Sequence, residues 1–241
     1  MSDVERLKKI IIESNNIVFF GGAGVSTESG IKDFRGKDGL YKENNYKYPP
    51  EYMLSHSCLI NHPDLFFDYY RNKMNCLDYE PNITHKYLTE LERKRKLKAI
   101  ITQNIDGLHQ KAGSQNILEL HGTVYKAYCM DCYKKYDGQI IFKSKSIPKC
   151  ECGGIIRPEV VLYEEALPDT YMIACDYISK ADVLIVAGTS LTVEPASSMI
   201  RLFKGNHLII INNEPTPYDY RANFVINDNM GKVFKMIGDK K

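Results

Sequence analysis

A short apolar segment that ends in a glycine-rich turn constrains the fold of this chain more than any other feature. Residues 17–20 read Ile-Val-Phe-Phe, and Gly21-Gly22-Ala23-Gly24 follow directly. A strand without polar alternation is usually covered on both faces, as in a parallel sheet. A strand, a glycine turn and a helix in this order open a dinucleotide-binding unit. Residues 17–24 therefore favour a parallel sheet with a nucleotide site at its first turn.

The same rhythm of strands and helices recurs along the chain. A helix is predicted near the N-terminus, where Ser2 and Glu5 fit a capping box and the apolar residues that follow fall on one face. Alternating strands and helices imply an α/β layered sheet with right-handed crossovers. Further strands are predicted over 98–102, 117–120, 182–187 and 207–211, with helices over 82–94 and 195–204.

Two stretches interrupt this rhythm and are interpreted as insertions into the sheet domain. Residues 36–80 are rich in tyrosine, asparagine and proline, with a helical pattern near 64–74, whereas residues 122–160 hold four cysteines. The predicted organisation is a sheet domain formed by residues 1–35, 81–121 and 161–241, a helical and loop insertion at 36–80, and a metal-binding module at 122–160.

The composition bounds the class of protein. Of 241 residues 44% are hydrophobic, and 32 basic against 30 acidic side chains give a formal net charge of +2. A chain this apolar is not disordered, and its near-neutral balance argues against a dedicated nucleic-acid or membrane-surface binder. No secretory signal is visible, and the seven cysteines do not resemble a secreted disulfide framework. We therefore expect a soluble cytoplasmic protein that requires no nucleic acid or membrane, and a monomer is compatible with the sequence.

Four cysteines in the second insertion are spaced like the ligands of one metal ion. Cys129 and Cys132 are followed, after 17 residues, by Cys150 and Cys152. Two such thiolate pairs can wrap one tetrahedral zinc ion, and four sulfur ligands leave no position for a reacting water. The spacing therefore predicts one structural zinc ion; core thiols, a redox pair and a zinc ribbon that binds nucleic acid are the alternatives. The second pair has one intervening residue instead of two, and the two glycines that follow would let the chain close the site.

Polar side chains follow the predicted strands at the points where the strands end. In an open α/β sheet, ligands bind outside the carboxyl ends of the strands, so these groups are expected to converge on one crevice. The glycine turn alone is a weak sign of a nucleotide site, because Thr27 stands where the third glycine of the usual fingerprint would be. In chain order the groups are Ser26, Thr27, Asp33 and Arg35; Gln103, Asn104 and Asp106; His121; Gly188, Thr189 and Ser190; and Asn212, Asn213 and Glu214.

His121 is the natural candidate for a general base. Imidazole titrates near neutral pH, and this residue stands at a strand end beside the cysteine module. The other histidines are interpreted as structural, because an isolated histidine in a folded chain is usually a hydrogen-bonded residue of the framework.

These motifs together resemble those of the sirtuins, and the resemblance extends from about residue 3 to residue 230. It implies an NAD-dependent protein lysine deacetylase of the compact bacterial type, with a Rossmann-like large domain, a small zinc module and a helical insertion around the active-site cleft. NAD would be consumed as a co-substrate, an acetylated protein or peptide would be the partner, and the products would be nicotinamide and O-acetyl-ADP-ribose. ADP-ribosyl transfer, NAD hydrolysis, another acyl group and a non-catalytic binding module are the alternatives. The motifs are Gly-Ala-Gly-Val-Ser at 22–26, Gly-Ile-Lys-Asp-Phe-Arg at 30–35, Thr-Gln-Asn-Ile-Asp at 102–106, His121-Gly122, the four cysteines, Gly-Thr-Ser-Leu at 188–191 and Asn212.

The resemblance also implies roles for individual residues. His121, Asn104 and Asp106 would be catalytic, with His121 as the base on a ribose hydroxyl. Substrate contacts would come from Val160, Val161, Tyr163 and Val193, by pairing with the peptide backbone and by lining the tunnel for the lysine stem. Contacts to NAD would come from Gly22, Ala23, Gly24, Thr27, Asp33, Phe34, Arg35, Gln103, Asn104, Ile105, Asp106, His121, Gly188, Thr189, Ser190, Asn212 and Asp228, and the zinc ligands would be Cys129, Cys132, Cys150 and Cys152.

Three features depart from the family pattern. Lys32 replaces a proline, Tyr163-Glu164-Glu165 stands where Phe-Gly-Glu is usual, and the second cysteine pair is Cys-x-Cys. Loss of the glycine is expected to reshape the peptide groove, and the two acids are expected to favour basic residues beside the acetyl-lysine. The Tyr-x-x-Arg spacing of members that prefer succinyl groups is missing from residues 66–71, which favours a neutral acyl group, most simply acetyl.

Overall fold

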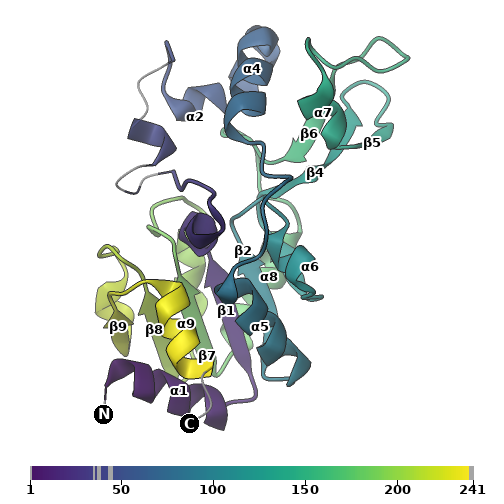
Figure 1. The fold of residues 1–241 in the computed structure, drawn as a ribbon. Coiled ribbons are helices and arrows are strands. Elements are labelled where there is room, and N and C mark those ends of the chain that lie inside the picture. The colour runs from purple at the N-terminus through teal and green to yellow at the C-terminus, as the bar shows by residue number, and fades with distance from the viewer. Residues whose placement is uncertain (1, 35, 37–38, 43–45, 239–241) are drawn as a thin grey trace.

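A six-stranded parallel sheet lies at the centre of the computed structural model, which describes residues 2–34, 36, 39–42 and 46–238 (Figure 1). The strand order is β3-β2-β1-β7-β8-β9, so the chain winds to one side of β1 and then to the other, as in dinucleotide-binding sheets. The topological switch point lies between β1 and β7. The strands are β1 (Ile17–Gly21), β2 (Leu97–Thr102), β3 (Ile117–Glu119), β7 (Val183–Ala187), β8 (His207–Ile211) and β9 (Phe224–Ile226).

Alternate residues of the central strands feed two hydrophobic cores, one on each face of the sheet. In β1, Phe19 packs into one core and Phe20 into the other, and both side chains are fully buried. The absence of polar alternation in the sequence is thereby explained. Within the described ranges, no helix has both the length and the apolar character needed to cross a bilayer. One core contains residues of α1 (Asp3–Glu13), α5 (Ile83–Arg93) and α9 (Met230–Gly238), the other contains residues of α8 (Thr170–Lys180) and the 3₁₀ helix η3 (Ser197–Leu202), and α6 (Leu108–Ala112) packs on α5.

The two predicted insertions form a second, smaller part of the molecule, at the top of Figure 1. Its antiparallel sheet has the order β5-β4-β6. Phe66 and Tyr70 belong to the same buried cluster as Val124 and Ile156 of this sheet, and Tyr70 stacks on Phe142 with ring centroids 5.6 Å apart. The insertions, which are separate in sequence, therefore share one hydrophobic core. The elements are β4 (Gly122–Cys129), β5 (Lys135–Asp137), β6 (Ile156–Val160), α7 (Gln139–Lys143), α2 (Pro50–Met53), α3 (His56–Asn61) and α4 (Pro63–Lys73).

Two sequence-based expectations about local structure require correction. The helix predicted over 195–204 is the shorter 3₁₀ helix η3, which follows a cis peptide at Pro195. The hydroxyl of Ser198 donates to the carbonyl of Pro195 at 2.8 Å, a side-chain bond of the kind that competes with a regular helix. The strand β9 was not predicted, because its apolar run is three residues long. The remaining short 3₁₀ helices are η1 (Ala23–Ser29), which follows the glycine turn, η2 (Leu40–Lys42) and η4 (Asp219–Arg221).

Two buried histidines pack against each other beside the sheet. His85 of α5 and His109 of α6 are 0% and 1% exposed, and their ring centroids lie 4.7 Å apart. Neither ring nitrogen of His109 has a hydrogen-bond partner within the described residues. Burial lowers the pKa of His85 to about 4, and burial together with the neighbouring His85 lowers the pKa of His109 well below 6.5. The folded protein therefore holds both rings neutral at pH values where an unfolded chain protonates them.

We expect the free energy of unfolding to fall as the pH is lowered from 6.5 towards 4. Below pH 6.5 the unfolded chain binds protons that the folded protein excludes, and each ring can cost up to about 2 kcal/mol at pH 5. His109→Leu removes one ring at similar volume and should lose less stability than the wild type between pH 7 and pH 5. Urea unfolding at both pH values measures this. Because cysteine ligands also protonate in acid, the difference between the two proteins is diagnostic, and equal losses would refute the assignment.

Candidate active site

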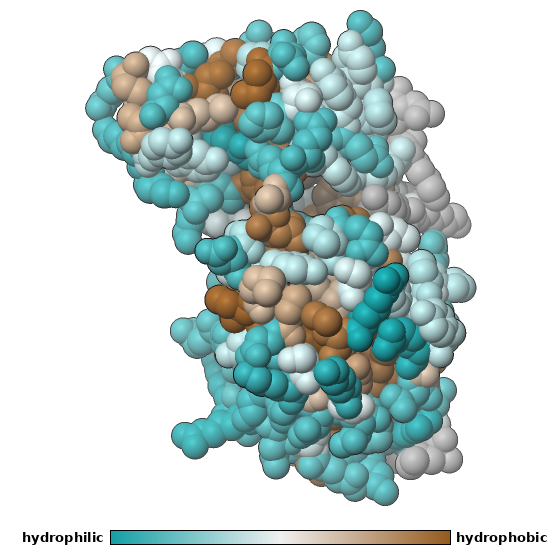
Figure 2. Space-filling view, turned by 180° about the vertical axis from the view of Figure 1, so that it is seen from behind, coloured by the Kyte–Doolittle hydropathy of each residue, from teal (hydrophilic) through white to brown (hydrophobic). Residues whose placement is uncertain are grey.

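The predicted crevice is a cavity of about 790 Å³ along the carboxyl edge of the large sheet, where this sheet meets the smaller part. From behind, the surface of the molecule is hollowed between the two parts (Figure 2). The volume of the cavity lies in the usual range of sites that bind small molecules. Of the predicted NAD and substrate residues, Arg35 lies outside the described residues and Gly22 is not part of the lining. The lining includes Ala23, Gly24, Thr27, Asp33, Phe34, Gln103, Asn104, Ile105, Asp106, His121, Val160, Val161, Tyr163, Gly188, Thr189, Ser190, Val193, Asn212 and Asp228.

The glycines of the first turn are required by the close approach of two backbone segments. The backbone N of Gly24 donates to the carbonyl oxygen of Gly188 at 2.8 Å. A Cβ atom added to Gly24 would lie 2.7 Å from the Cα of Gly188, and one added to Gly22 would lie 2.7 Å from the Cβ of Thr189. Gly22 thus packs the turn against the next strand end, which explains its place behind the cavity wall.

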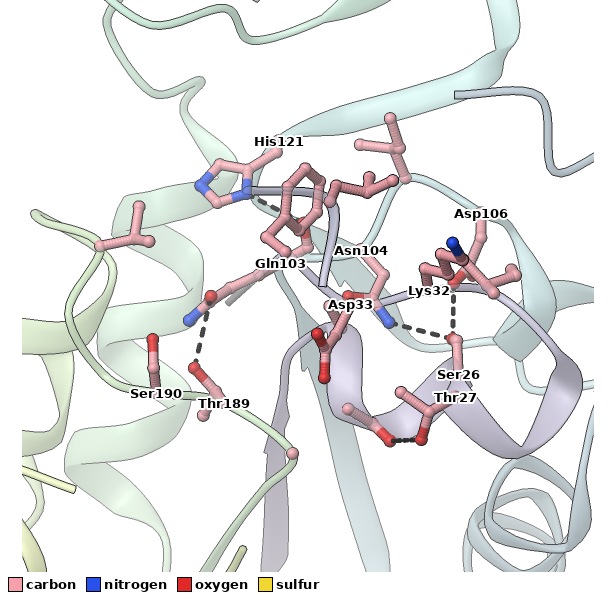
Figure 3. A pocket seen from close by; sticks show the side chains of 18 of the residues that line it. Ser26, Thr27, Lys32, Asp33, Gln103, Asn104, Asp106, His121, Thr189 and Ser190 are labelled. Carbon is pink, nitrogen blue, oxygen red and sulfur yellow. Dashed lines mark hydrogen bonds between the residues drawn. The ribbon is translucent and has the colours of Figure 1, made fainter. Parts of the chain in front are cut away.

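A buried hydrogen-bond network joins the first turn to the end of β2 (Figure 3). The hydroxyl of Ser26 donates to Asp106 at 2.6 Å, and the side-chain amide of Asn104 donates to the Ser26 oxygen at 3.1 Å. The second carboxylate oxygen of Asp106 accepts the backbone N–H of Leu108 at 2.9 Å. Burial raises the pKa of Asp106, and these hydrogen bonds oppose that rise. Ser26, which was expected in the crevice but was assigned no role in binding or catalysis, therefore connects two of the three predicted catalytic side chains.

His121 is oriented by a backbone carbonyl. Its Nδ1 lies 2.9 Å from the carbonyl oxygen of Gln103 (Figure 3). Because a carbonyl oxygen only accepts, Nδ1 carries the proton and Nε2 bears the lone pair. Burial lowers the pKa of His121 and the bond to Gln103 raises it, with burial the larger effect. The neutral ring at pH 7 has the tautomer that a general base needs.

A buried donor beside His121 fits a polar ligand. The side-chain Nε2 of Gln103 is buried without a hydrogen-bond partner among the described residues, although the side chain lines the cavity. A buried polar group left without a partner is costly, so such a group at a cavity wall points to a ligand or water that completes it. Together with the glycine turn, this donor set fits the sugar and phosphate groups of a dinucleotide.

The segment after β6 connects His121 to the helical insertion. The backbone N of Val161 donates to the carbonyl of His121 at 2.9 Å. Glu164 adopts the left-handed conformation, with φ of 76°, and its carboxylate accepts bonds from the backbone and the hydroxyl of Ser57 at 2.9 and 2.7 Å. A non-glycine residue in this conformation carries a cost of about 1 kcal/mol, which these bonds offset. The side chain of Glu164 thus replaces the missing glycine with an anchor to α3.

The second acid of this segment is neutralised inside the protein. The carboxylate of Glu165 accepts from the buried Arg157 at 2.5 and 2.9 Å and from the backbone N of Leu162 at 2.9 Å. Although burial opposes it, the bond to Arg157 holds the pKa of Glu165 at about 2. Both acids are engaged within the chain, which argues against the expectation that they select basic residues in a substrate.

The four cysteines of the second insertion meet in space. Their sulfur atoms all lie within 4.8 Å of one another, with 3.5 Å between Cys129 and Cys152 and 3.6 Å between Cys132 and Cys150. A tetrahedral zinc ion with Zn–S bonds of about 2.3 Å places its ligands about 3.8 Å apart, whereas a disulfide requires about 2.05 Å. The donor set therefore fits one structural zinc ion.

The Cys-x-Cys spacing is accommodated by the glycines that follow it, as predicted. Gly153 has φ of 92°, in the left-handed region, and a Cβ atom on Gly154 would lie 2.7 Å from the sulfur of Cys129. The hydroxyl of Tyr136 donates to Cys150 at 3.0 Å and lowers the pKa of this thiol to about 6, which favours the thiolate that zinc requires.

We expect one zinc ion per chain, bound by these cysteines. Cys132→Ser should reduce the zinc content from one ion to near zero and lower the melting temperature, because zinc binding contributes to folding. Cys175→Ser, at a half-buried thiol on α8 remote from the cluster, is the matched control and should keep the ion. Elemental analysis with thermal unfolding measures both. Full zinc content in Cys132→Ser would contradict the ligand set.

Comparisons with known proteins agree with this geometry. The model of the Sir2 family matches residues 22–195. A Clostridium acetobutylicum protein named NAD-dependent protein deacetylase is 55% identical over 98% of both chains, and one of the same name from Clostridium tetani is 54% identical over 97% of this chain and 96% of that protein. A solved structure described as Sir2 with a p53 peptide and NAD+ has a TM-score of 0.86 at 36% identity, covering 98% of this chain and 97% of that one.

A further solved structure, from work on the mechanism and regulation of Sir2 enzymes, has a TM-score of 0.89 at 39% identity and covers 98% of this chain and 97% of the other. The likeness thus extends over the sheet, the insertions and the cleft between them. With a family model that spans most of the chain and relatives matched over nearly their whole length, the chain belongs to the Sir2 family.

Proposed function

We propose that this chain is an NAD-dependent protein lysine deacetylase, which removes acetyl groups from lysine side chains and yields nicotinamide and O-acetyl-ADP-ribose. The observation that carries the proposal is the setting of His121. Its Nδ1 is bound to a backbone carbonyl, and the ring lines the same cavity as the glycine turn and the segment after β6. The relatives named NAD-dependent protein deacetylase support this activity.

The residues of the cleft would have different roles, according to their chemistry. NAD, when bound, supplies a glycosidic bond to nicotinamide that can break and an ADP-ribose that accepts the acetyl group. Asn104 and Gln103 would hold ribose hydroxyls, and His121 would take a proton from one of them through Nε2. Asp106 and Ile105 would line the pocket for the nicotinamide amide. These groups orient and bind, which is what a reaction that builds positive charge on a ribose requires.

Other residues would shape the cleft and exclude water from it. Phe34 would cover the ribose and exclude the water that wastes an activated intermediate. The remaining NAD contacts are proposed for the predicted residues that line the cavity, which are Ala23, Gly24, Thr27, Asp33, Gly188, Thr189, Ser190, Asn212 and Asp228.

The acetylated peptide would bind along the segment after β6. Val160, Val161 and Tyr163 line the cavity on one side and Val193 lies on another part of its wall. Main-chain hydrogen bonds to an added peptide strand give affinity with little sequence preference, which suits a protein substrate of varied sequence. Val161, Tyr163 and Phe34 offer apolar surface for the stem of the acetyl-lysine.

The organisation and location of the protein belong to the same proposal. Residues 1–35, 81–121 and 161–241 would bind NAD, while 36–80 and 122–160 would close the cleft, an assignment that the shared core of the two insertions supports. A cytoplasmic location is supported by the thiolate ligands, which persist in a reducing compartment.

The role of His121 is tested by His121→Ala. Loss of the base should lower kcat for NAD-dependent deacetylation of an acetyl-lysine peptide by about 10²- to 10⁴-fold. Mass spectrometry follows the acetyl group, and chromatography follows nicotinamide. His62→Ala, at an exposed histidine of the helical insertion, is the control.

The same assay on the wild type distinguishes the alternative functions. Nicotinamide release without deacetylation would indicate ADP-ribosyl transfer, NAD hydrolysis or another acyl group. No turnover by folded zinc-loaded protein would indicate a binding module.

The pH dependence of activity should carry the signature of the same residue. A general base must be neutral, and the lowered pKa of His121 keeps it neutral down to pH values below 6.5. The acid limb of log(kcat/KM) is therefore expected to bend at an apparent pKa below 6.5, with little change between pH 7 and pH 8. Initial rates with saturating NAD between pH 5 and pH 8 measure it. A bend above pH 7 would refute the assignment of His121 as the base.

A further inference from the structure

A hydrogen bond between two tyrosine hydroxyls connects the 3₁₀ helix η2 to the segment after β6. The Oη atoms of Tyr41 and Tyr163 form a hydrogen bond although the residues are 122 positions apart in sequence. Tyr41 lies in η2, shortly after Phe34, and Tyr163 lines the cavity beyond β6. The bond therefore joins the neighbourhood of Phe34 to the wall of the cavity beyond β6.

Tyr41 holds the residues that flank Phe34. The backbone N of Tyr41 donates to the carbonyl of Phe34 at 2.9 Å, and that of Leu40 donates to the carbonyl of Asp33 at the same distance. The rings of Phe34 and Tyr41 meet edge to face with centroids 5.7 Å apart. A displacement of Tyr41 would therefore displace Phe34, the side chain proposed to cover the ribose.

Tyr163 lies in a segment that is fixed on both sides. Its backbone N donates to the carbonyl of Leu54, and its carbonyl accepts from His56, both at 3.0 Å. Two residues earlier, Val161 is bonded to the carbonyl of His121. The Tyr163 hydroxyl thus extends from a segment that is hydrogen-bonded to His121, the proposed base, and that is proposed to pair with the peptide.

We propose that Tyr41 and Tyr163 are positioning residues that couple the peptide-binding segment to the NAD-covering residues. This inference rests on the deacetylase function proposed above. Neither hydroxyl touches the reacting atoms: Tyr163 acts through Tyr41, and Tyr41 acts through Phe34. A peptide that pairs with the segment after β6 stabilises, through this bond, the position in which Phe34 covers the ribose. Because coupling is reciprocal, bound ADP-ribose tightens peptide binding by the same factor.

The first test uses the free protein and requires no activity. The backbone amides of Leu40 and Tyr41 donate to the carbonyls of Asp33 and Phe34, and their hydrogen exchange reports the opening of these two bonds. Tyr163→Phe deletes one oxygen atom and keeps the ring. It should accelerate exchange at these two amides about fivefold, which is the effect of losing one hydrogen bond. Unchanged exchange would overturn the proposal.

The second test measures coupling between ligands. ADP-ribose lacks nicotinamide and is not turned over, so calorimetry gives its Kd with and without an acetyl-lysine peptide. The wild type should bind ADP-ribose about fivefold more tightly when the peptide is present. Tyr41→Phe, Tyr163→Phe and the double variant should each bring this factor close to one and to the same extent, because all three remove one shared bond. Additive losses, or undiminished coupling, would overturn the proposal.

A matched control separates this bond from general effects of a lost hydroxyl. Tyr48 packs on Tyr52 in the same insertion, with centroids 4.8 Å apart, and does not belong to the described lining of the cavity. Tyr48→Phe should keep the exchange rates and the coupling of the wild type. A failure of the deacetylase function has a different signature, since the wild type would then release no acetyl group while Tyr163→Phe still accelerated exchange at Leu40 and Tyr41.

Discussion

The site depends on the close approach of two backbone segments at the carboxyl edge of the sheet. Parallel pairing of β1 with β7 places Gly21 opposite Ala187, so the turns that follow both strands leave the sheet side by side. The hydrogen bond from the backbone N of Gly24 to the carbonyl of Gly188 holds the two turns so close together that a Cβ atom on Gly24 does not fit between them. A wall built from backbone groups results, and the cleft can admit a bulky dinucleotide at the switch point of the sheet.

The sequence was most informative where the signal is local. The apolar runs of the central strands are long enough to be recognised, and the polar residues that end them lie at one edge because parallel strands all end there. The zinc ligands were also predicted from a local signal, which is the short spacing within each pair of cysteines. In contrast, β9 has three residues, and η3 begins with two serines shortly after a proline, so neither has a periodicity that distinguishes it. Ser26 was expected in the crevice, but its linking role was not predicted, because its partners Asp106 and Asn104 lie 80 and 78 positions away.

Long-range pairings explain the other gaps between sequence and structure. Nothing in the sequence pattern shows that Glu164 anchors α3 or that the two insertions share a core, because both depend on how β6 is placed beside the helices. The pairing of Glu165 with Arg157, eight residues earlier, depends on how the chain turns back after β6. Cys129 lies in the same buried cluster as Phe66 of α4. The zinc site therefore supports more than its own loops: through β6 it supports the segment on which the peptide is proposed to bind.

The edge strands of the large sheet have a further consequence. Both β3 and β9 contain three residues, whereas the four strands between them have five or six and are paired on both sides. An edge strand presents unpaired N–H and C=O groups, and a long, flat edge is a template on which another chain can add a strand. With so little exposed backbone at either edge, a newly made copy of this protein offers its neighbours a poor surface for cross-chain aggregation, even though the sheet itself is strongly apolar.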